Sequence, residues 1–101
     1  MPAPAIDVPR EKIEAFCRKW KVRELALFGS VLREDFRPDS DVDVLVTFEE
    51  GARRSYWEWA DMLEDLRTIF GRNVDLVPRG ALKNPFRRSE ILRTARTIYA
   101  A

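Results

Sequence analysis

Residues 27–46 read LFGSVLREDFRPDSDVDVLV, and this stretch decides the fold. Apolar residues dominate positions 24–28, and they return in residues 41–48, where apolar and polar positions alternate at first. Short apolar runs that are bounded by turn residues are typical of strands. Gly29 and Ser30 mark the end of the first run, and ten residues lie between Ser30 and the second run. We therefore predict a buried strand, a turn into a short helix, and a second strand.

The Gly29-Ser30 pair predicts a turn that approaches phosphate groups. Glycine adopts positive φ values and lets the backbone come close to a ligand. A serine at the start of a helix offers its hydroxyl and an unpaired backbone N–H to phosphate oxygens. Taken alone, the same pair would favour an ordinary strand-to-helix turn with a serine N-cap.

Asp41 and Asp43 stand two residues apart in the second run, so on a strand their side chains point to the same face. Two unpaired carboxylates so close together repel each other, and a divalent cation removes this conflict. Mg²⁺ prefers a few carboxylates completed by water and substrate phosphates. With the Gly-Ser turn at a fixed distance, the pair predicts a site for a nucleoside triphosphate and Mg²⁺, or Mn²⁺ in its place. The alternative is a solvated strand that begins after a turn at Pro38.

A third carboxylate, Asp75, interrupts the short apolar run of residues 73–77. If this run forms a strand beside residues 41–48, Asp75 faces the same metal site. Two metal ions ~3.5–4 Å apart clamp the attacking and leaving oxygens of a phosphoryl displacement. Asp75 would then bind the second metal ion and help to deprotonate the nucleophile. Alternatively, it pairs with Arg72 or Arg79.

Composition limits the classes of protein that remain open. A chain of 101 residues supports one domain with a modest core. The formal net charge of +1 argues against direct DNA binding, which normally needs a marked basic excess. We find no apolar run long enough for a bilayer and no signal peptide, and a lone cysteine, Cys17, is consistent with the cytoplasm. Histidine is missing from the chain, so carboxylates must carry the chemistry.

We expect residues 1–8 to form a disordered lead and residues 9–101 to form a single domain. The first helix is predicted from Pro9 to about Lys21. Its apolar residues recur at the i, i+3, i+4, i+7 spacing of a buried stripe. The members of that stripe are Ile13, Phe16, Cys17 and Trp20.

A later helix is predicted between Ser55, which opens a capping-box pattern, and Gly71, a plausible C-terminal stop. Its expected inward stripe consists of Trp59, Leu63, Leu66 and Phe70, with Trp57 pointing elsewhere and Met62 partly so. A last helix is expected from the Asn84-Pro85 pair to about Ile98.

The order helix, strand, helix, strand, helix, strand, helix predicts a small α/β domain. We expect a mixed β-sheet of about three to four strands with helices packed against it. The last helix is basic, and both a solvated face and a surface for an acidic partner or RNA remain open. The basic residues of this C-terminal stretch, which includes the residue before the helix, are Lys83, Arg87, Arg88, Arg93 and Arg96.

At this point the chain resembles a known family, the minimal nucleotidyltransferases of the DNA polymerase β superfamily, which act as antitoxins beside HEPN-domain toxins. The resemblance extends from about Val22 to Ala95, and the combined motifs are specific. They comprise residues 27–30, Arg33, residues 37–46 and residues 71–77. One departure is Glu34, which stands where many relatives have glycine.

The resemblance implies the nucleotidyltransferase fold and the transfer of a nucleoside monophosphate, usually AMP from ATP, with Mg²⁺. Carried over residue by residue, it implies that the nucleotide is bound by Gly29, Ser30, Arg33 and Ser40. It likewise implies that the metal-binding, catalytic carboxylates are Asp41, Asp43 and Asp75.

The resemblance also implies a protein partner. Full-size members of the superfamily add a second domain that holds the acceptor, and because we expect a single domain here, a partner would have to supply that function. We expect a HEPN toxin to be that partner and a tyrosine hydroxyl of the toxin to receive AMP, which neutralises it. A hetero-oligomer with the toxin and a homo-oligomer both stay open. The rival interpretation is a non-enzymatic antitoxin that inhibits its toxin by binding alone. Three converging aspartates favour the enzyme, because a protein that acts by binding alone does not need them. A nucleotidyltransferase that modifies small molecules is a third alternative.

Overall fold

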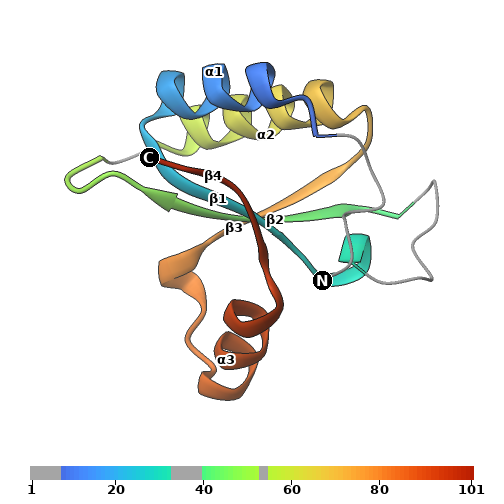
Figure 1. The fold of residues 1–101 in the computed structure, drawn as a ribbon. Helices are drawn as coiled ribbons and strands as arrows, with labels where there is room; N and C mark the ends of the chain where they lie inside the picture. The colour runs from blue at the N-terminus through green and yellow to red at the C-terminus, as the bar shows by residue number, and fades with distance from the viewer. Residues whose placement is uncertain (1–7, 33–39, 53–54) are drawn as a thin grey trace.

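The computed structural model describes residues 8–32, 40–52 and 55–101, and in these residues it shows a four-stranded sheet with helices on both faces (Figure 1). In chain order the elements are α1 (Arg10–Trp20), β1 (Val22–Phe28), the 3₁₀ turn η1 (Gly29–Leu32), β2 (Val42–Phe48), α2 (Tyr56–Phe70), β3 (Val74–Pro78), the 3₁₀ turn η2 (Arg79–Ala81), α3 (Pro85–Thr94) and β4 (Arg96–Ala100). The predicted α/β class is confirmed.

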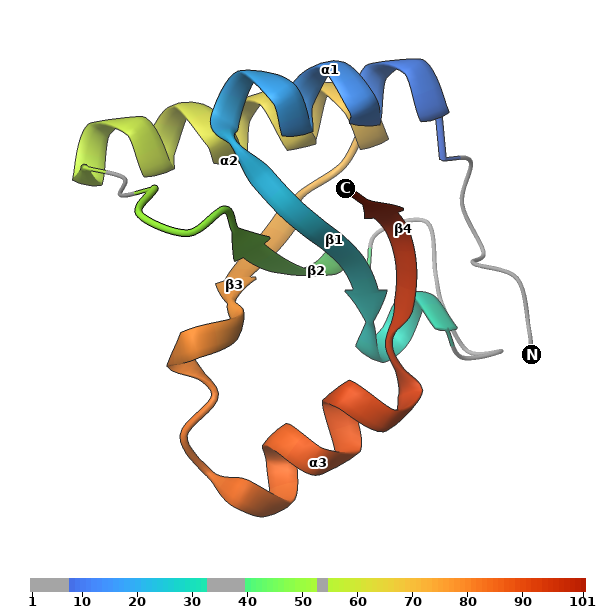
Figure 2. The same cartoon turned by 60° about the vertical axis from the view of Figure 1, so that its left-hand side comes forward.

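The sheet has the strand order β3-β2-β1-β4. Strand β1 pairs antiparallel with β2 and with β4, whereas β2 and β3 run parallel. The sheet is therefore mixed, as predicted. Helices α1 and α2 lie side by side on one face, and α3 lies on the opposite face (Figures 1 and 2). The parallel pair needs a crossover connection, and α2 provides it.

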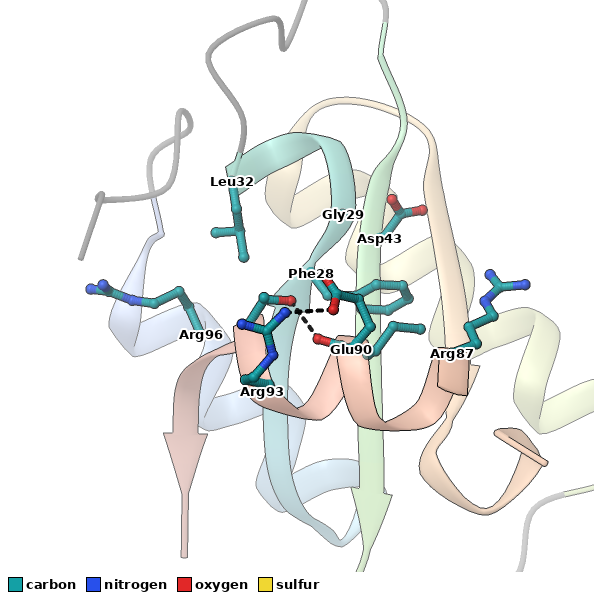
Figure 3. Close-up of a pocket in the computed structure, with 10 residues that line it drawn as sticks. Phe28, Gly29, Leu32, Asp43, Arg87, Glu90, Arg93 and Arg96 are labelled. Atoms are coloured by element: carbon teal, nitrogen blue, oxygen red, sulfur yellow. Dashed lines mark hydrogen bonds and ion pairs between the residues drawn. The ribbon is translucent and has the colours of Figure 1, made fainter. Parts of the chain in front are cut away.

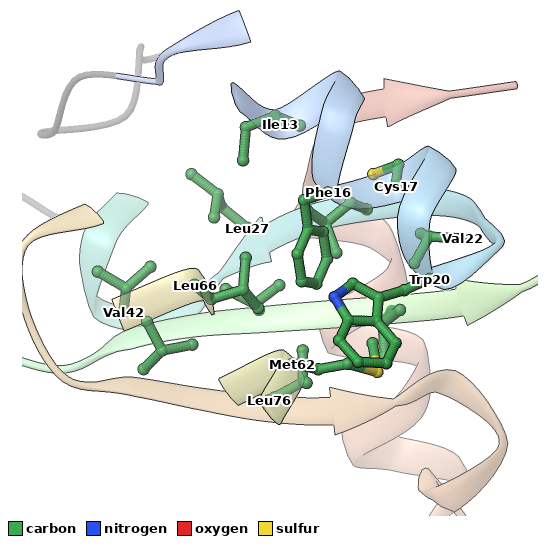
Figure 4. Close-up of a cluster of buried hydrophobic side chains, with 14 of the residues drawn as sticks. Ile13, Phe16, Cys17, Trp20, Val22, Leu27, Val42, Met62, Leu66 and Leu76 are labelled. Carbon is green, nitrogen blue, oxygen red and sulfur yellow. The ribbon is translucent and has the colours of Figure 1, made fainter. Parts of the chain in front are cut away.

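The main core fills the space between the sheet and the layer formed by α1 and α2 (Figure 4). The predicted stripe of α1 is confirmed, because Ile13, Phe16, Cys17 and Trp20 are all buried. Burial raises the pKa of the Cys17 thiol to about 12. Since the thiolate is the reactive form of cysteine, Cys17 is a packing residue.

Both predicted ends of α2 are confirmed. Ser55 Oγ accepts a hydrogen bond from the Glu58 backbone N–H at 3.2 Å, and the Glu58 side chain accepts one from the Ser55 backbone N–H. At the other end, Gly71 adopts the left-handed conformation with φ 69°, and its N–H donates to the Arg67 carbonyl at 2.8 Å. Local sequence signals therefore set the length of this helix.

The predicted inward stripe of α2 needs a correction at Met62, which is fully buried beside Leu66. The expected stripe members on either side are only partly buried: Trp59, Leu63 and Phe70. Because Met62 and Leu66 are four residues apart, they share one face of the helix. The buried face of α2 is therefore centred on Met62 and Leu66, and it is rotated from the predicted stripe toward Met62. Trp57 is exposed, as predicted.

The prediction that the last helix continues to about Ile98 is wrong. Helix α3 begins as expected, since Asn84 Oδ1 accepts hydrogen bonds from the next backbone N–H groups and Pro85 occupies the first turn. It ends at Thr94, and Ala95 adopts an extended conformation with ψ 143°. The remaining residues pair with the open edge of β1 as β4. Their β-branched and aromatic side chains suit a strand, and the edge of β1 that would otherwise be unpaired favours strand over helix.

Most of the predicted disordered lead, residues 1–8, lies outside the described residues. Val8, the first described residue, packs against the main core. In the described part of the chain, none of the helices is both long and apolar enough to span a membrane.

Candidate functional site

The site is built around Gly29, where β1 passes into η1. Gly29 has a positive φ of 73°, a conformation that side chains disfavour. A β-carbon at this position would overlap the Oδ2 atom of Asp43 and come within 3.2 Å of its Cγ. The turn backbone and the Asp43 carboxylate are therefore in direct contact. Only glycine allows this approach.

The register of the strands brings Asp43 and Asp75 together. Phe28 pairs with Asp43 across the antiparallel β1–β2 ladder, and Asp43 pairs with Asp75 across the parallel β2–β3 ladder. Neighbouring strands lie ~4.8 Å apart, and paired residues point to the same face of the sheet. Their neighbours Val42 and Val74 are buried against the α1–α2 layer, so the two aspartates occupy the face that carries α3. Asp43 is partly buried, and Asp75 is exposed.

Asp41 and Ser40 lie just before β2, not in it. Asp41 is exposed, whereas Ser40 is partly buried. The backbone N–H of Val42 donates to the Asn73 carbonyl at 3.0 Å, which ties this segment to the start of β3. Ser40 and Asp41 are therefore held at the same end of the sheet as Asp43.

Asp43 and Asp75 form an oxygen-only pair that suits a hard cation such as Mg²⁺. Water and phosphate oxygens normally complete the coordination of that ion. In the described ranges, however, His, Cys, Asp and Glu side chains do not gather in a group of three or more that could hold a metal ion. The structure thus brings two of the three predicted carboxylates into register, while the three-aspartate metal set stays a prediction.

A cavity of about 600 Å³ opens beside Asp43 and Gly29 (Figure 3). Its volume lies within the range of about 300–1,000 Å³ that is usual for ligand sites. The turn and β2 form one wall, and α3 with the start of β4 forms the other. The lining residues are Phe28, Gly29, Leu32, Asp43, Arg87, Glu90, Ile91, Arg93, Thr94 and Arg96.

The sequence analysis did not predict that α3 forms one wall of the cavity. The sequence indicates a solvated face or a surface for an acidic partner or RNA, yet three of the basic residues line the cavity: Arg87, Arg93 and Arg96. One available signal is the spacing of positions 87, 90, 91 and 94, which places them on one face of a helix. That spacing identifies the face but not its neighbour, because the neighbour depends on how α3 docks on the sheet.

Two of the predicted nucleotide-binding groups lie outside the described part of the chain: Arg33 and the side chain of Ser30. Asp75 does not line the cavity, although it is the register partner of Asp43. Their roles stay predictions.

The fold and the site together indicate a class of enzyme. A glycine turn that can approach phosphate, carboxylates on neighbouring strands and an adjoining cavity with a basic wall are the parts required for phosphoryl or nucleotidyl transfer. A comparison with protein families agrees with this class. The family model described as a nucleotidyltransferase domain matches residues 9–98, so the chain belongs to the nucleotidyltransferase domain family.

Two curated relatives show how far this similarity extends. A Methanocaldococcus jannaschii protein, provisionally named a protein adenylyltransferase, is 37% identical over 73 residues, which is 72% of this chain and 73% of that protein. The protein adenylyltransferase MntA of Thermococcus cleftensis is 41% identical over 66 residues, 65% of each chain. The resemblance to minimal nucleotidyltransferases is thereby confirmed.

Solved structures support the same fold. A structure provisionally described as a minimal nucleotidyltransferase is 37% identical, covers 85% of both chains and superposes with a TM-score of 0.68. A second structure contains a tri-AMPylated HEPN toxin of Shewanella oneidensis in complex with its MNT antitoxin. It matches with a TM-score of 0.63 and 18% identity over 91% of this chain and 70% of that one, which is a similarity of fold alone.

Proposed function

We propose that this protein transfers AMP from ATP to a hydroxyl group, a tyrosine hydroxyl, of a partner HEPN toxin and thereby acts as its antitoxin. The observation that carries the proposal is the contact between Gly29 and Asp43 at the mouth of the cavity. It joins a backbone that phosphate can approach to a carboxylate that can bind metal. Asp75, in register with Asp43, supplies a second carboxylate on the same face.

In this proposal the triphosphate of ATP lies against the turn at Gly29. The acceptor oxygen forms a bond to the α-phosphorus while the bond to the bridging oxygen breaks, and pyrophosphate leaves. Asp43 and Asp75 would hold Mg²⁺ together with Asp41. When bound, Mg²⁺ offsets the repulsion between carboxylates and phosphates. Asp75 is exposed, so it is open to an incoming hydroxyl and would accept its proton.

Support for the acceptor comes from the relatives. A protein that is 41% identical is named a protein adenylyltransferase, and a solved complex of the same fold holds a tri-AMPylated HEPN toxin beside its antitoxin. We therefore infer a hetero-oligomer with such a toxin. Because the reaction consumes ATP, the cytoplasm is the compartment that would support it.

Transfer of label from ATP tests this function. The protein and its cognate toxin are incubated with Mg²⁺ and ATP that is labelled at either the α- or the γ-phosphate. We expect the toxin to acquire the α-label and not the γ-label. Asp43→Asn should abolish labelling, while Asp61→Asn, which removes an exposed carboxylate from α2 on the other side of the sheet, should not.

Two outcomes would contradict the proposal. A toxin that takes up the γ-label would indicate phosphate transfer instead. A toxin that is inhibited without any label, by wild type and Asp43→Asn alike, would indicate the rival function, a non-enzymatic antitoxin that acts by binding.

A further inference from the structure

The inner face of α3 is held against the site by an apolar contact. Ile91 is buried in a second cluster on this side of the sheet, together with Ala26, Phe28, Leu45 and Leu82. This contact fixes the rotation of α3 about its own axis. Arg87 precedes Ile91 by four residues, so it shares the face of the helix that Ile91 turns toward the sheet. The packing of Ile91 therefore directs Arg87 toward the cavity that contains Asp43.

The arginines of this wall differ in their charge pairing. Arg93 forms an ion pair with Glu90, which also lines the cavity. Arg87 has no ion-pair partner among the described residues. In Figure 3, Arg87 is on the same side of the cavity as Asp43, and Arg96 is on the other. Arg87 is thus an arginine of this wall that lies on the same side of the cavity as Asp43 and forms no ion pair with a described residue.

A guanidinium group in this position matches phosphate chemistry. Arginine stays protonated at any physiological pH and can bind two phosphate oxygens at once. The carboxylates of Asp43 and Asp75 add negative charge on the face where the polyanionic triphosphate would bind. A metal ion that they held would offset part of this charge. An arginine on the α3 wall of the cavity would offset more of it.

We propose that Arg87 binds the part of the triphosphate that leaves as pyrophosphate. This inference rests on the proposed function. As the acceptor oxygen bonds to the α-phosphorus, the electron pair of the broken bond stays with the pyrophosphate, and the hydroxyl proton passes to Asp75 or to water. Arg87 meets the negative charge that accumulates on the leaving group.

The chain supplies a matched control in Arg88, the next residue on α3. Arg88 is exposed and does not line the cavity. Arg87→Gln and Arg88→Gln remove the same charge from the same turn of the helix. A difference between them therefore reports position and not net charge.

Titration calorimetry in the presence of Mg²⁺ compares wild type, Arg87→Gln and Arg88→Gln with three ligands: ATP, pyrophosphate and AMP. We expect Arg87→Gln to weaken the binding of ATP and pyrophosphate by ~10-fold or more, as for a lost hydrogen bond to a charged group. The binding of AMP should change by less than about twofold, and Arg88→Gln should leave all three ligands within that limit. Arg87→Lys should recover part of the loss, because it keeps the charge.

Each contrary outcome has its own meaning. Equal ATP and pyrophosphate binding by Arg87→Gln and Arg88→Gln would overturn the role of Arg87 while leaving the proposed function intact. An equal loss for AMP would show that Arg87 shapes the cavity and does not bind phosphate. Unchanged ATP binding with weaker association to the toxin would assign Arg87 to docking and also overturn the proposal. If wild type binds pyrophosphate but transfers no AMP, the proposed function fails and the Arg87 comparison still stands.

Discussion

The Asp43 carboxylate lies so close to the backbone of Gly29 that no side chain can be placed between them. This contact joins the end of β1 to the start of β2 on the side of the sheet that carries α3. It also defines a glycine whose replacement has two separate costs. One is the positive φ, and the other is the overlap with Asp43.

Gly29→Ala should destabilise the protein and abolish ATP binding. Gly51→Ala is the matched control, because Gly51 has a similar φ of 79° but a β-carbon added there would meet nothing within 4 Å. Thermal or denaturant unfolding should show a loss of about 1–2 kcal/mol for Gly51→Ala, from the backbone conformation alone. Gly29→Ala should cost ~1–3 kcal/mol more, from the overlap. Equal losses of unfolding free energy would show that the Asp43 side chain moves away from the added β-carbon without cost.

Binding of ATP should require a divalent cation, because Asp43 and its register partner Asp75 would place two carboxylates near a triphosphate bound at the Gly29 turn. Calorimetry with ATP should show binding in Mg²⁺ or Mn²⁺ and little heat in EDTA. Asp43→Asn should lose the metal dependence while unfolding at nearly the same temperature, since its side chain is outside the main core. Equal ATP affinity with and without metal would contradict the proposal that Asp43 and Asp75 bind a metal ion.

The sequence was sufficient to predict those parts of the site that depend on local patterns. The two-residue alternation around Asp43 and the apolar run around Asp75 predict strands wherever they lie in the chain. The spacing to Gly29 then indicates their proximity. Partner choice is not local, however. Residues 96–100 became β4 because β1 offered an edge, and Arg87 faces the cavity because Ile91 docks on the sheet.

Another prediction concerns pH and the contact between α1 and α2. Burial alone would raise the pKa of Asp65, but hydrogen bonds from Trp20 Nε1 and Lys19 Nζ, each 3.0 Å long, and the charge of Lys19 outweigh it and hold the pKa below its usual value. A depressed folded pKa adds stability above the unfolded value of ~3.9, and this stability is lost as the pH falls through the folded pKa.

Asp65→Asn should therefore be less stable than wild type at pH 7, by no more than ~1 kcal/mol because solvent screens the partly exposed pair. The difference should shrink as the pH falls below about 4. Urea unfolding at several pH values measures it. Asp61→Asn, on the same helix and exposed, should show no comparable narrowing. A difference that is constant with pH would contradict the assignment to the Asp65 carboxylate.

Met62 is one of the two α2 residues, with Leu66, on which the packing of this helix should depend strongly. Its side chain is fully buried, so Met62→Ala should lower the free energy of unfolding by about 2–5 kcal/mol. Trp57→Ala provides the contrast, because Trp57 is 77% exposed and should change stability by less than about 0.5 kcal/mol. Denaturant unfolding separates the two. A larger loss for Trp57 than for Met62 would mean that α2 packs by a different face.

The most direct test of the central claim is the intact mass of the HEPN toxin after reaction with this protein, ATP and Mg²⁺. The account predicts a mass increase of one or more AMP units, located on a tyrosine and accompanied by loss of toxin activity. Asp43→Asn should leave the mass unchanged and the toxin active. A toxin that is silenced at its original mass, with Asp43 dispensable, would contradict the account.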